Sequence, residues 1–396
     1  MIVTSPSAPP TGAAMPQPAA RPLKVVGIFP AFDPAINELA MVWRELAARG
    51  LVECRMIGAA TDVLKGSNAA SLSAEFPNMS IRRFVGDSGD DTASADLIEW
   101  AAALQPDVIV CEIESTVVVG RRVQRLSPAP ILLHVEHWFE SRALPRRYHL
   151  GIPMLRDPVQ ALWRGWFGRQ ADAVMIANPL ERPAIEAGGE RYAYAPWPHP
   201  PAAGAEPAPR AGRDLDRVIY VGSMSRWKAV ETLVANAERL LETVPEATAT
   251  IVGPPTDATA REALARLDRW GPERLLRLPR LPREAALEAI RGALCVIAPS
   301  GSMGWGQIGD AWNAGTPVIG VARFYDLDPD RNALVAGDPD AFVARYRQLR
   351  ADAALWDRLS TEGLRTVREG HSIRVVGDAV MSGLHRTLRL QRTRRA

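Results

Sequence analysis

The sequence predicts an α/β protein made of two Rossmann-like domains that face a cleft. Two observations lead to this fold class. Short apolar runs rich in β-branched residues alternate with stretches of helical periodicity, as in parallel sheets covered by helices. The alternation occurs twice, and a segment rich in proline and alanine, PHPPAAGAEPAPRAG (198–212), separates the two sets. A chain of 396 residues is long enough for two such domains.

The first domain is expected over residues 23–198, after a disordered tail rich in alanine and proline at 1–22. Its first strand, LKVVGIF, ends at Pro30, and Asp33 and Pro34 then supply an N-cap and a first-turn proline for the next helix. The expected strands are 23–29, 52–58, 80–86, 107–113, 129–135, 171–178 and 192–198, and the expected helices are 35–49, 93–104 and 155–170.

The second domain is expected over 216–370, after a linker at 199–215 and before a C-terminal helix and basic tail at 371–396. The arginines of that tail predict a frayed, solvated end. The expected strands are 217–223, 248–253, 274–281, 294–300 and 317–321, and the expected helices are 227–243, 257–269, 283–292, a short one before Gly315, 339–350 and 372–391.

Composition limits the kinds of protein that this chain can be. A formal net charge of +2 gives no argument for a nucleic-acid partner. The three cysteines form no CxxC pair, and Cys111 and Cys295 lie in apolar runs that read as buried strands, so we expect a reducing, cytoplasmic setting. Acidic turns such as Asp326–Asp330 are poor metal signals, and neither a metal nor a cofactor is expected. The arginine- and tryptophan-rich stretch 142–169 predicts either a helix packed on the first domain or a peripheral contact with an anionic membrane.

A glycine-rich loop, GSMGWGQIG (301–309), follows an apolar strand and opens a short helix. Gly304–Gly309 fits the GxGxxG pattern of NAD(P)-dependent oxidoreductases, with Asp326 and Asp328 as acids beyond it. Against this interpretation, the helix ends early, at Gly315, and the loop belongs to the fourth strand–helix unit of its domain. The glycines could instead serve only a tight turn, or they could expose backbone N–H groups to a diphosphate. The loop alone leaves these three possibilities open.

A second stretch of the sequence favours the interpretation that the glycine loop binds a diphosphate. YVGSMSRWKAVETL (220–233) places Gly222 at the end of a strand and Arg226 and Lys228 around the start of the next helix. Cations at a helix N-terminus oppose its dipole unless an anion compensates. Both stretches follow strands of one parallel sheet, so we expect the two cations to face the glycine loop at one edge of that sheet.

These stretches resemble the donor domain of GT-B glycosyltransferases, in particular the retaining family 4 enzymes (glycosyl transferases group 1). The resemblance covers about 217–370 and includes RLPRLPREAALEAIRGALCVIAPS and the phrase Gly-Thr-Pro-Val-Ile at 315–319. It implies that Lys228 and Arg226 stabilise the departing diphosphate. The donor-binding residues that it implies are Gly222, Ser223, Arg280, Met303, Gly304, Trp305, Gly306 and Asp310. Ser223 stands where the family has an arginine, the first acid of the family's glycine loop is absent, and Asp310 replaces the second acid, a glutamate.

In the first half, HVEHWFE (134–140) follows a strand at the place where this family often has a histidine. His137 is the expected catalytic contact, with His134 and Glu136 as alternatives. The resemblance implies a metal-independent, retaining transfer of a sugar from a nucleotide-diphosphate donor to a glycan, lipid-linked or small-molecule acceptor. Two alternatives stay open: an NAD(P)-dependent oxidoreductase, and a catalytically inactive nucleotide-binding protein of the same fold.

Overall fold

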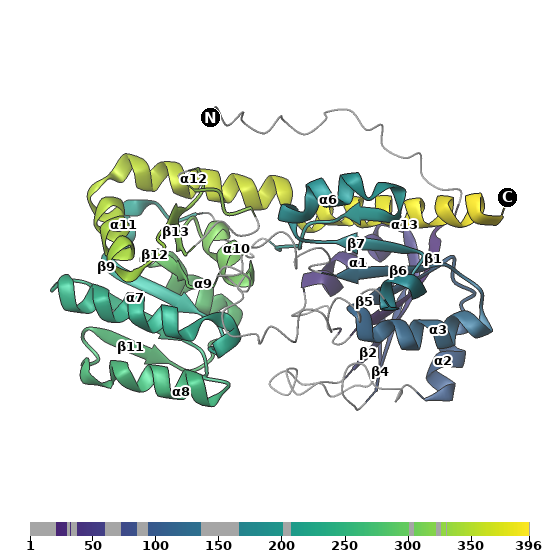
Figure 1. Ribbon diagram of the computed structural model, residues 1–396, viewed down its shortest axis with the longest axis horizontal. Coiled ribbons are helices and arrows are strands. Elements are labelled where there is room, and N and C mark those ends of the chain that lie inside the picture. The colour runs from purple at the N-terminus through teal and green to yellow at the C-terminus, as the bar shows by residue number, and fades with distance from the viewer. Residues whose placement is uncertain are drawn as a thin grey trace.

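The protein folds into two lobes, each built on its own sheet (Figure 1). The computed structural model describes residues 21–29, 32, 38–59, 73–84, 94–135, 166–200, 207–300, 305–321, 326–329 and 331–395. The first sheet has eight strands in the order β3-β4-β2-β1-β5-β6-β7-β8, and all neighbours are parallel except the β3–β4 hairpin. The strands are β1 Leu23–Phe29, β2 Val52–Ala59, β3 Ser73–Phe76, β4 Met79–Phe84, β5 Val108–Glu112, β6 Ile131–Val135, β7 Ala173–Ile176 and β8 Tyr192–Tyr194.

Helices cover both faces of this sheet, so its central strands are buried on both sides. Helix α1 packs on one face with Trp43 and Leu46, and α2 and α3 pack on the other with Ile98 and Val123. The helices of this lobe are α1 Glu38–Ala48, α2 Ala95–Ala102, α3 Val117–Leu126 and α6 Arg182–Ala187.

The second sheet has six strands in the order β11-β10-β9-β12-β13-β14, and all its pairings are parallel. Helices α7, α8 and α11 bury apolar side chains on one face, while α9 and α10 cover the other. The strands are β9 Asp214–Val221, β10 Thr248–Val252, β11 Leu275–Leu278, β12 Ala293–Ala298, β13 Val318–Gly320 and β14 Leu334–Val335. The helices are α7 Val230–Thr243, α8 Ala258–Ala265, α9 Arg283–Arg291, α10 Trp305–Asn313, α11 Pro339–Ala351 and α12 Ala353–Gly370.

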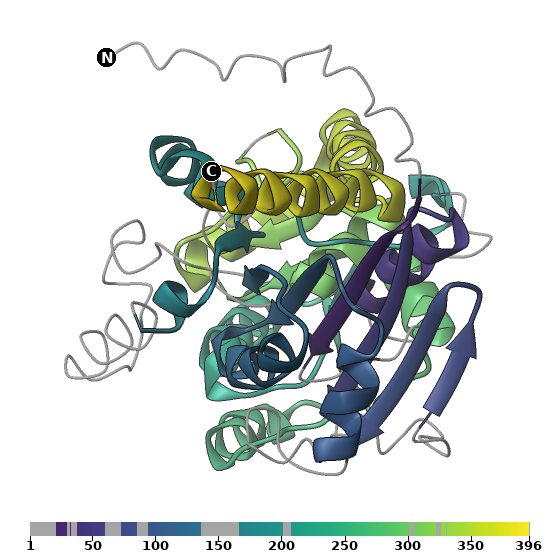
Figure 2. The ribbon, with the colours of Figure 1, turned by 90° about the vertical axis from the view of Figure 1, so that its right-hand side faces the viewer.

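The last helix, α13 (Ile373–Arg395), returns to the first lobe. Figure 2 shows it in yellow, lying over the first sheet. Val380 and Leu384 join the core beneath α1, and Arg394 pairs with Asp172 at 2.9 Å. The expectation of a frayed end is wrong, because the helix continues to Arg395 and buries its apolar face on the sheet, but the side chains of 392–394 are exposed, as a solvated end requires.

The predicted α/β class with two parallel sheets is confirmed. The three cysteines are free and buried, as the apolar runs around Cys111 and Cys295 indicated. Residues 142–165 lie outside the described part of the chain; beyond them, Phe167 is buried in the first core, whereas Trp166 is 51% exposed. Within the described ranges, no helix is long and apolar enough to cross a membrane.

Candidate functional site

The candidate site lies at the carboxyl edge of the second sheet. Strands β9 and β12 are parallel neighbours, so the segments that follow them leave the sheet at the same edge. Gly222 directly follows β9, and only two residues separate the end of β12 from the start of the glycine loop at residue 301. The two stretches that the sequence singled out therefore follow strands that end at one edge of the sheet, where open α/β sheets bind their ligands.

Two glycines allow the turns after β9 and β10 to pass each other closely. A Cβ atom on Gly253 would lie 2.1 Å from the carbonyl oxygen of Gly222. Gly253 also has a φ of +125°, which side-chain-bearing residues rarely adopt. The hydroxyl of Tyr220 donates to the carbonyl of Ser223 at 3.0 Å. These contacts fix the backbone on which Ser223 and the following turn sit.

Lys228 is held at this edge by its own loop. It closes a 3-10 turn (Arg226–Lys228), and the side chain of Ser225 accepts the N–H of Lys228 at 3.3 Å. Its Nζ donates to Oγ of Ser223 at 2.9 Å. The side chain is half-buried, and this burial lowers the pKa of the Lys228 ammonium. Arg226 is exposed, and its backbone N–H binds Asp257 at 2.9 Å, which caps α8.

The helix after the glycine loop carries an ion pair that the sequence did not predict. Asp310 lies one turn into α10, and its carboxylate binds the guanidinium of Arg283, at the start of α9, at 2.9 Å. Burial raises the pKa of the Asp310 carboxyl, and Arg283 opposes that effect. Asp310 is thus engaged by an arginine 27 residues away in the chain.

The other expected donor contacts are only partly described. Arg280 lies exposed in the loop after β11. Gly306 is the second residue of α10, and Trp305 is described by its backbone. Met303, Gly304, Glu136 and His137 lie outside the described residues.

His134, the alternative to His137, is a buried side chain of β6. It is 2% exposed and stacks on Trp197 with ring centroids 6.2 Å apart. Burial lowers its pKa to about 4, so the ring is neutral at ordinary pH. Its Nε2 is buried with no hydrogen-bond partner among the described residues.

Two further histidines join the segments that connect the lobes. The backbone N–H of His199 donates to the carbonyl of His371 at 2.6 Å. The ring of His371 lies 2.8 Å from the carbonyl of Trp197 and 2.8 Å from the carboxylate of Asp326. Asp326, one of the two acids that the oxidoreductase interpretation noted beyond the glycine loop, is thus bound to a histidine between the lobes. Neither histidine stood out in the sequence, because each lies in an irregular segment without a motif.

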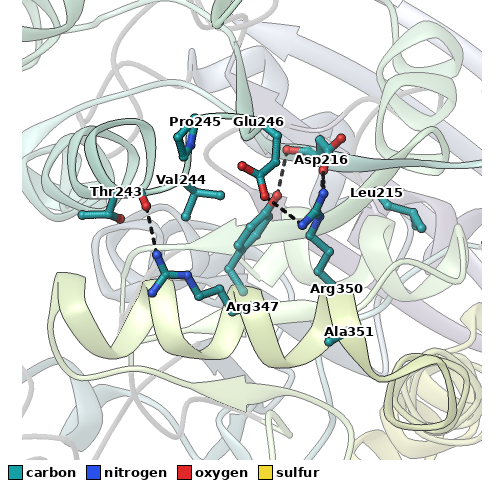
Figure 3. A pocket seen from close by; sticks show the side chains of 10 residues that line it. Leu215, Asp216, Thr243, Val244, Pro245, Glu246, Arg347, Arg350 and Ala351 are labelled. Atoms are coloured by element: carbon teal, nitrogen blue, oxygen red, sulfur yellow. Dashed lines mark hydrogen bonds and ion pairs between the residues drawn. The ribbon is translucent and has the colours of Figure 1, made fainter.

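A pocket of about 640 Å³ lies at the opposite edge of the second sheet, where β9 begins (Figure 3). Its arginines already have partners: Arg350 binds Asp216 at 2.7 Å and Glu246 at 2.9 Å, and Arg347 donates to the carbonyl of Thr243.

A smaller cavity of about 330 Å³ lies at the carboxyl ends of β10 and β11, beside the loop of Lys228. Its lining includes Met224, Gly253, Leu278 and Pro279. Among the described residues, no three histidine, cysteine or acidic side chains are grouped to hold a metal ion.

Comparison with known proteins identifies this half of the chain. The family model of glycosyl transferases group 1 matches residues 216–352. Residues 216–352 are a glycosyltransferase domain. The match spans the turn of Lys228, the ion pair of Asp310 and all of the second sheet except the first two residues of β9. It decides against the oxidoreductase interpretation of the glycine loop. No curated protein sequence matches the chain.

Solved structures show that more than nine-tenths of the chain has the GT-B fold. Sucrose-phosphate synthase from Thermosynechococcus elongatus superposes with a TM-score of 0.71 at 18% identity, over 92% of this chain and 99% of its own. Anabaena Alr3699/HepE in complex with UDP-glucose gives 0.66 at 14% identity, over 92% and 99%. The α,α-trehalose 6-phosphate synthase from Burkholderia multivorans gives 0.68 at 15% identity, over 95% and 98%. Domain family and fold together make this chain a glycosyltransferase.

Proposed function

We propose that this glycosyltransferase uses a nucleotide-diphosphate sugar, binds its diphosphate between Lys228 and the N-terminus of α10, and transfers the sugar with retention and without a metal ion. The observation that carries the proposal is the tethered ammonium of Lys228, half-buried at the edge where β9 and β12 end. A lysine whose charge is partly desolvated gains by pairing with an anion. The first amides of α10 supply a second, dipolar contact.

Transfer of the sugar requires that the leaving diphosphate be stabilised while the sugar gains positive charge. Lys228 and the backbone N–H groups of the first turn of α10 would provide fixed positive charge where the negative charge develops. Arg226, exposed on the same turn, would add a second cation once the lobes close over the donor. Exclusion of water by such closure would protect the donor from hydrolysis.

UDP is our first choice of nucleotide, because Alr3699/HepE, of the same fold, has been solved with UDP and with UDP-glucose. The cavity of about 330 Å³ beside the Lys228 loop is the place that we propose for the base. We propose a cytoplasmic enzyme, because its three cysteines are free thiols. The acceptor would be a glycan, a lipid-linked sugar or a small molecule that enters from the first lobe.

Titration calorimetry of UDP, GDP and ADP, with EDTA present, tests the proposal. We expect one diphosphate to bind the wild type and Lys228→Ala to reduce its affinity by about a hundredfold or more, the effect of losing a charged hydrogen bond in a desolvated site. Lys24→Ala is the matched control, because Lys24 lies in β1 of the other sheet. Unchanged affinity in Lys228→Ala would refute the site. NMR of the anomeric proton of the product tests retention.

A further inference from the structure

The segment that leaves the first lobe lies along one face of α10. The ring nitrogen Nε2 of His199 lies 2.9 Å from the carbonyl oxygen of Gly306, and the side chain of Asn313 donates to the carbonyl of Pro200 at 3.0 Å. Gly309 lies between them, and a Cβ atom there would fall 1.3 Å from the His199 ring. Gly306, Gly309 and Asn313 are spaced three and four residues apart, so they form one stripe of the helix.

His199 is the central contact of this stripe. It is 1% exposed, and its backbone N–H binds the carbonyl of His371. Glu38 of α1 and Arg283 of α9 are the other charged groups that act on its ring. The ring is therefore held against α10 by its hydrogen bond to Gly306, while the backbone of His199 binds the segment of His371. Gly309 is a glycine because the ring fills the space of a side chain.

Because a carbonyl oxygen only accepts hydrogen bonds, Nε2 of His199 donates to Gly306. The carbonyl of Gly306 belongs to the same rigid peptide plane as the N–H of Gln307. An α-helix leaves the N–H groups at its N-terminus without an intrahelical acceptor, and in the described part of α10 these include the N–H groups of residues 305–307. The hydrogen bond of His199 thus fixes the direction of one amide at the helix end where we place the diphosphate.

We infer that His199 is a positioning residue for donor binding, which orients the first turn of α10 toward the diphosphate. The inference rests on the proposed function. It assigns to the linker a role that goes beyond joining the lobes, since the same residue touches α10 and the second connection at His371.

Two amide substitutions separate the hydrogen bond from the packing. The side-chain amide of His199→Gln reaches the place of Nε2 and can still donate to Gly306, whereas that of His199→Asn is too short. We expect His199→Asn to weaken UDP about tenfold and to raise the KM of the donor with the KM of the acceptor unchanged, while His199→Gln stays within about threefold of the wild type. His385→Asn, on α13, is the matched control.

The outcomes are distinct. Equal UDP affinity in His199→Asn, His199→Gln and the wild type overturns the inference, even if the melting temperature falls, because a purely structural histidine changes stability and not the affinity of the folded protein. If His199→Asn does not fold, Asn313→Ser tests the next contact of the stripe, and unchanged donor affinity there overturns the inference too. If the wild type binds none of the three diphosphates, the proposed function itself fails.

Discussion

Lys228 donates a hydrogen bond from its Nζ to Oγ of Ser223, and the two atoms lie 2.9 Å apart at the carboxyl edge of the second sheet. The residues are five positions apart, at the two ends of the turn that follows β9. The contact keeps a flexible side chain in one conformation. Pre-ordering of this kind lowers the entropy that binding costs.

Ser223→Ala removes this anchor and keeps the charge. We expect affinity for the nucleoside diphosphate to fall about threefold to tenfold, which is less than in Lys228→Ala, because the charge stays and only the pre-ordering of one side chain, worth about 0.5–1.5 kcal/mol, is lost. The free energy of unfolding should change by less than about 1 kcal/mol. Titration calorimetry and urea denaturation measure the two quantities. An affinity loss as large as that of Lys228→Ala would contradict the ranking.

Arg283→Ala breaks the ion pair and leaves the partly buried carboxylate of Asp310 without its counter-ion. We expect the free energy of unfolding to fall by about 1–2 kcal/mol at pH 7.5, a discounted value because both side chains are partly exposed.

The loss of unfolding free energy in Arg283→Ala should increase with pH. Burial already raises the pKa of the Asp310 carboxyl, and removal of Arg283 raises it further. The folded variant then holds a proton that the unfolded chain has released, so its deficit grows as pH rises from about 4 to 7. Urea denaturation at pH 5.0 and pH 7.5 measures this change, and equal deficits at both values would exclude the mechanism.

Gly253→Ala places a methyl group against the backbone of Gly222, at a φ of +125°. We expect a loss of about 2 kcal/mol or more in the free energy of unfolding, because the neighbouring atoms are backbone and cannot give way. Gly370→Ala is the control: Gly370 ends α12 and has open space around it. Its effect should stay within about 1 kcal/mol. Similar values for both variants, from thermal or urea unfolding, would contradict the close approach.

The strands were predictable from the sequence where a short apolar run rich in β-branched residues marks them. LKVVGIF forms β1 over the expected residues, and the other expected strands lie within a few residues of the observed ones. Helix α3 was missed because VVVGRRVQRL opens with three β-branched residues and a glycine. Helix α12 carries Gly363 in its interior, where only the packed structure shows the reason: the ring of Trp312 fills the place of its side chain.

The place of the β9 turn in the candidate site was also predictable from local sequence. Gly222, Ser223 and Lys228 lie within one strand–turn–helix unit, so their order in the sequence locates them. The partners of α10 come from far along the chain: His199 is 107 residues from Gly306. No local pattern indicates contacts of this kind, because they exist only once the lobes have been joined.

His134→Phe should reduce the loss of stability in acid. Burial lowers the pKa of His134 to about 4, against about 6.5 in the unfolded chain. As pH falls below 6.5 the unfolded chain binds a proton that the folded protein does not, so the free energy of unfolding decreases. At pH 5 this amounts to about 2 kcal/mol, which the phenylalanine variant should not lose. The phenylalanine ring keeps the stack on Trp197 and removes a nitrogen that has no hydrogen-bond partner among the described residues.

The difference between urea unfolding at pH 7.5 and pH 5.0 measures this effect. Part of the wild-type loss should remain in His134→Phe, because burial also lowers the pKa of His199 to about 4. An identical pH dependence in variant and wild type would mean that His134 does not titrate below its unfolded value.

Arg213→Lys should be among the most destabilising single substitutions in the second lobe. The guanidinium is 7% exposed and lies 4.7 Å from the ring of Trp356. It donates to the carbonyls of Ala208, Ala293, Ala314 and Gly315 and to the hydroxyl of Thr316. It thereby ties the linker to the end of α10, and it explains the phrase Gly-Thr-Pro as a structural element of this chain.

A lysine ammonium has three donors and no plane to stack on Trp356, so several carbonyls would lose their donor. We expect a loss of about 3 kcal/mol in the free energy of unfolding, measured in urea at pH 7.5. Arg392→Lys is the matched control, because it makes the same substitution on the exposed side of α13, away from these contacts. Its free energy of unfolding should stay within about 0.5 kcal/mol of the wild type. If Arg213→Lys matches this control, the network does not hold the linker to α10.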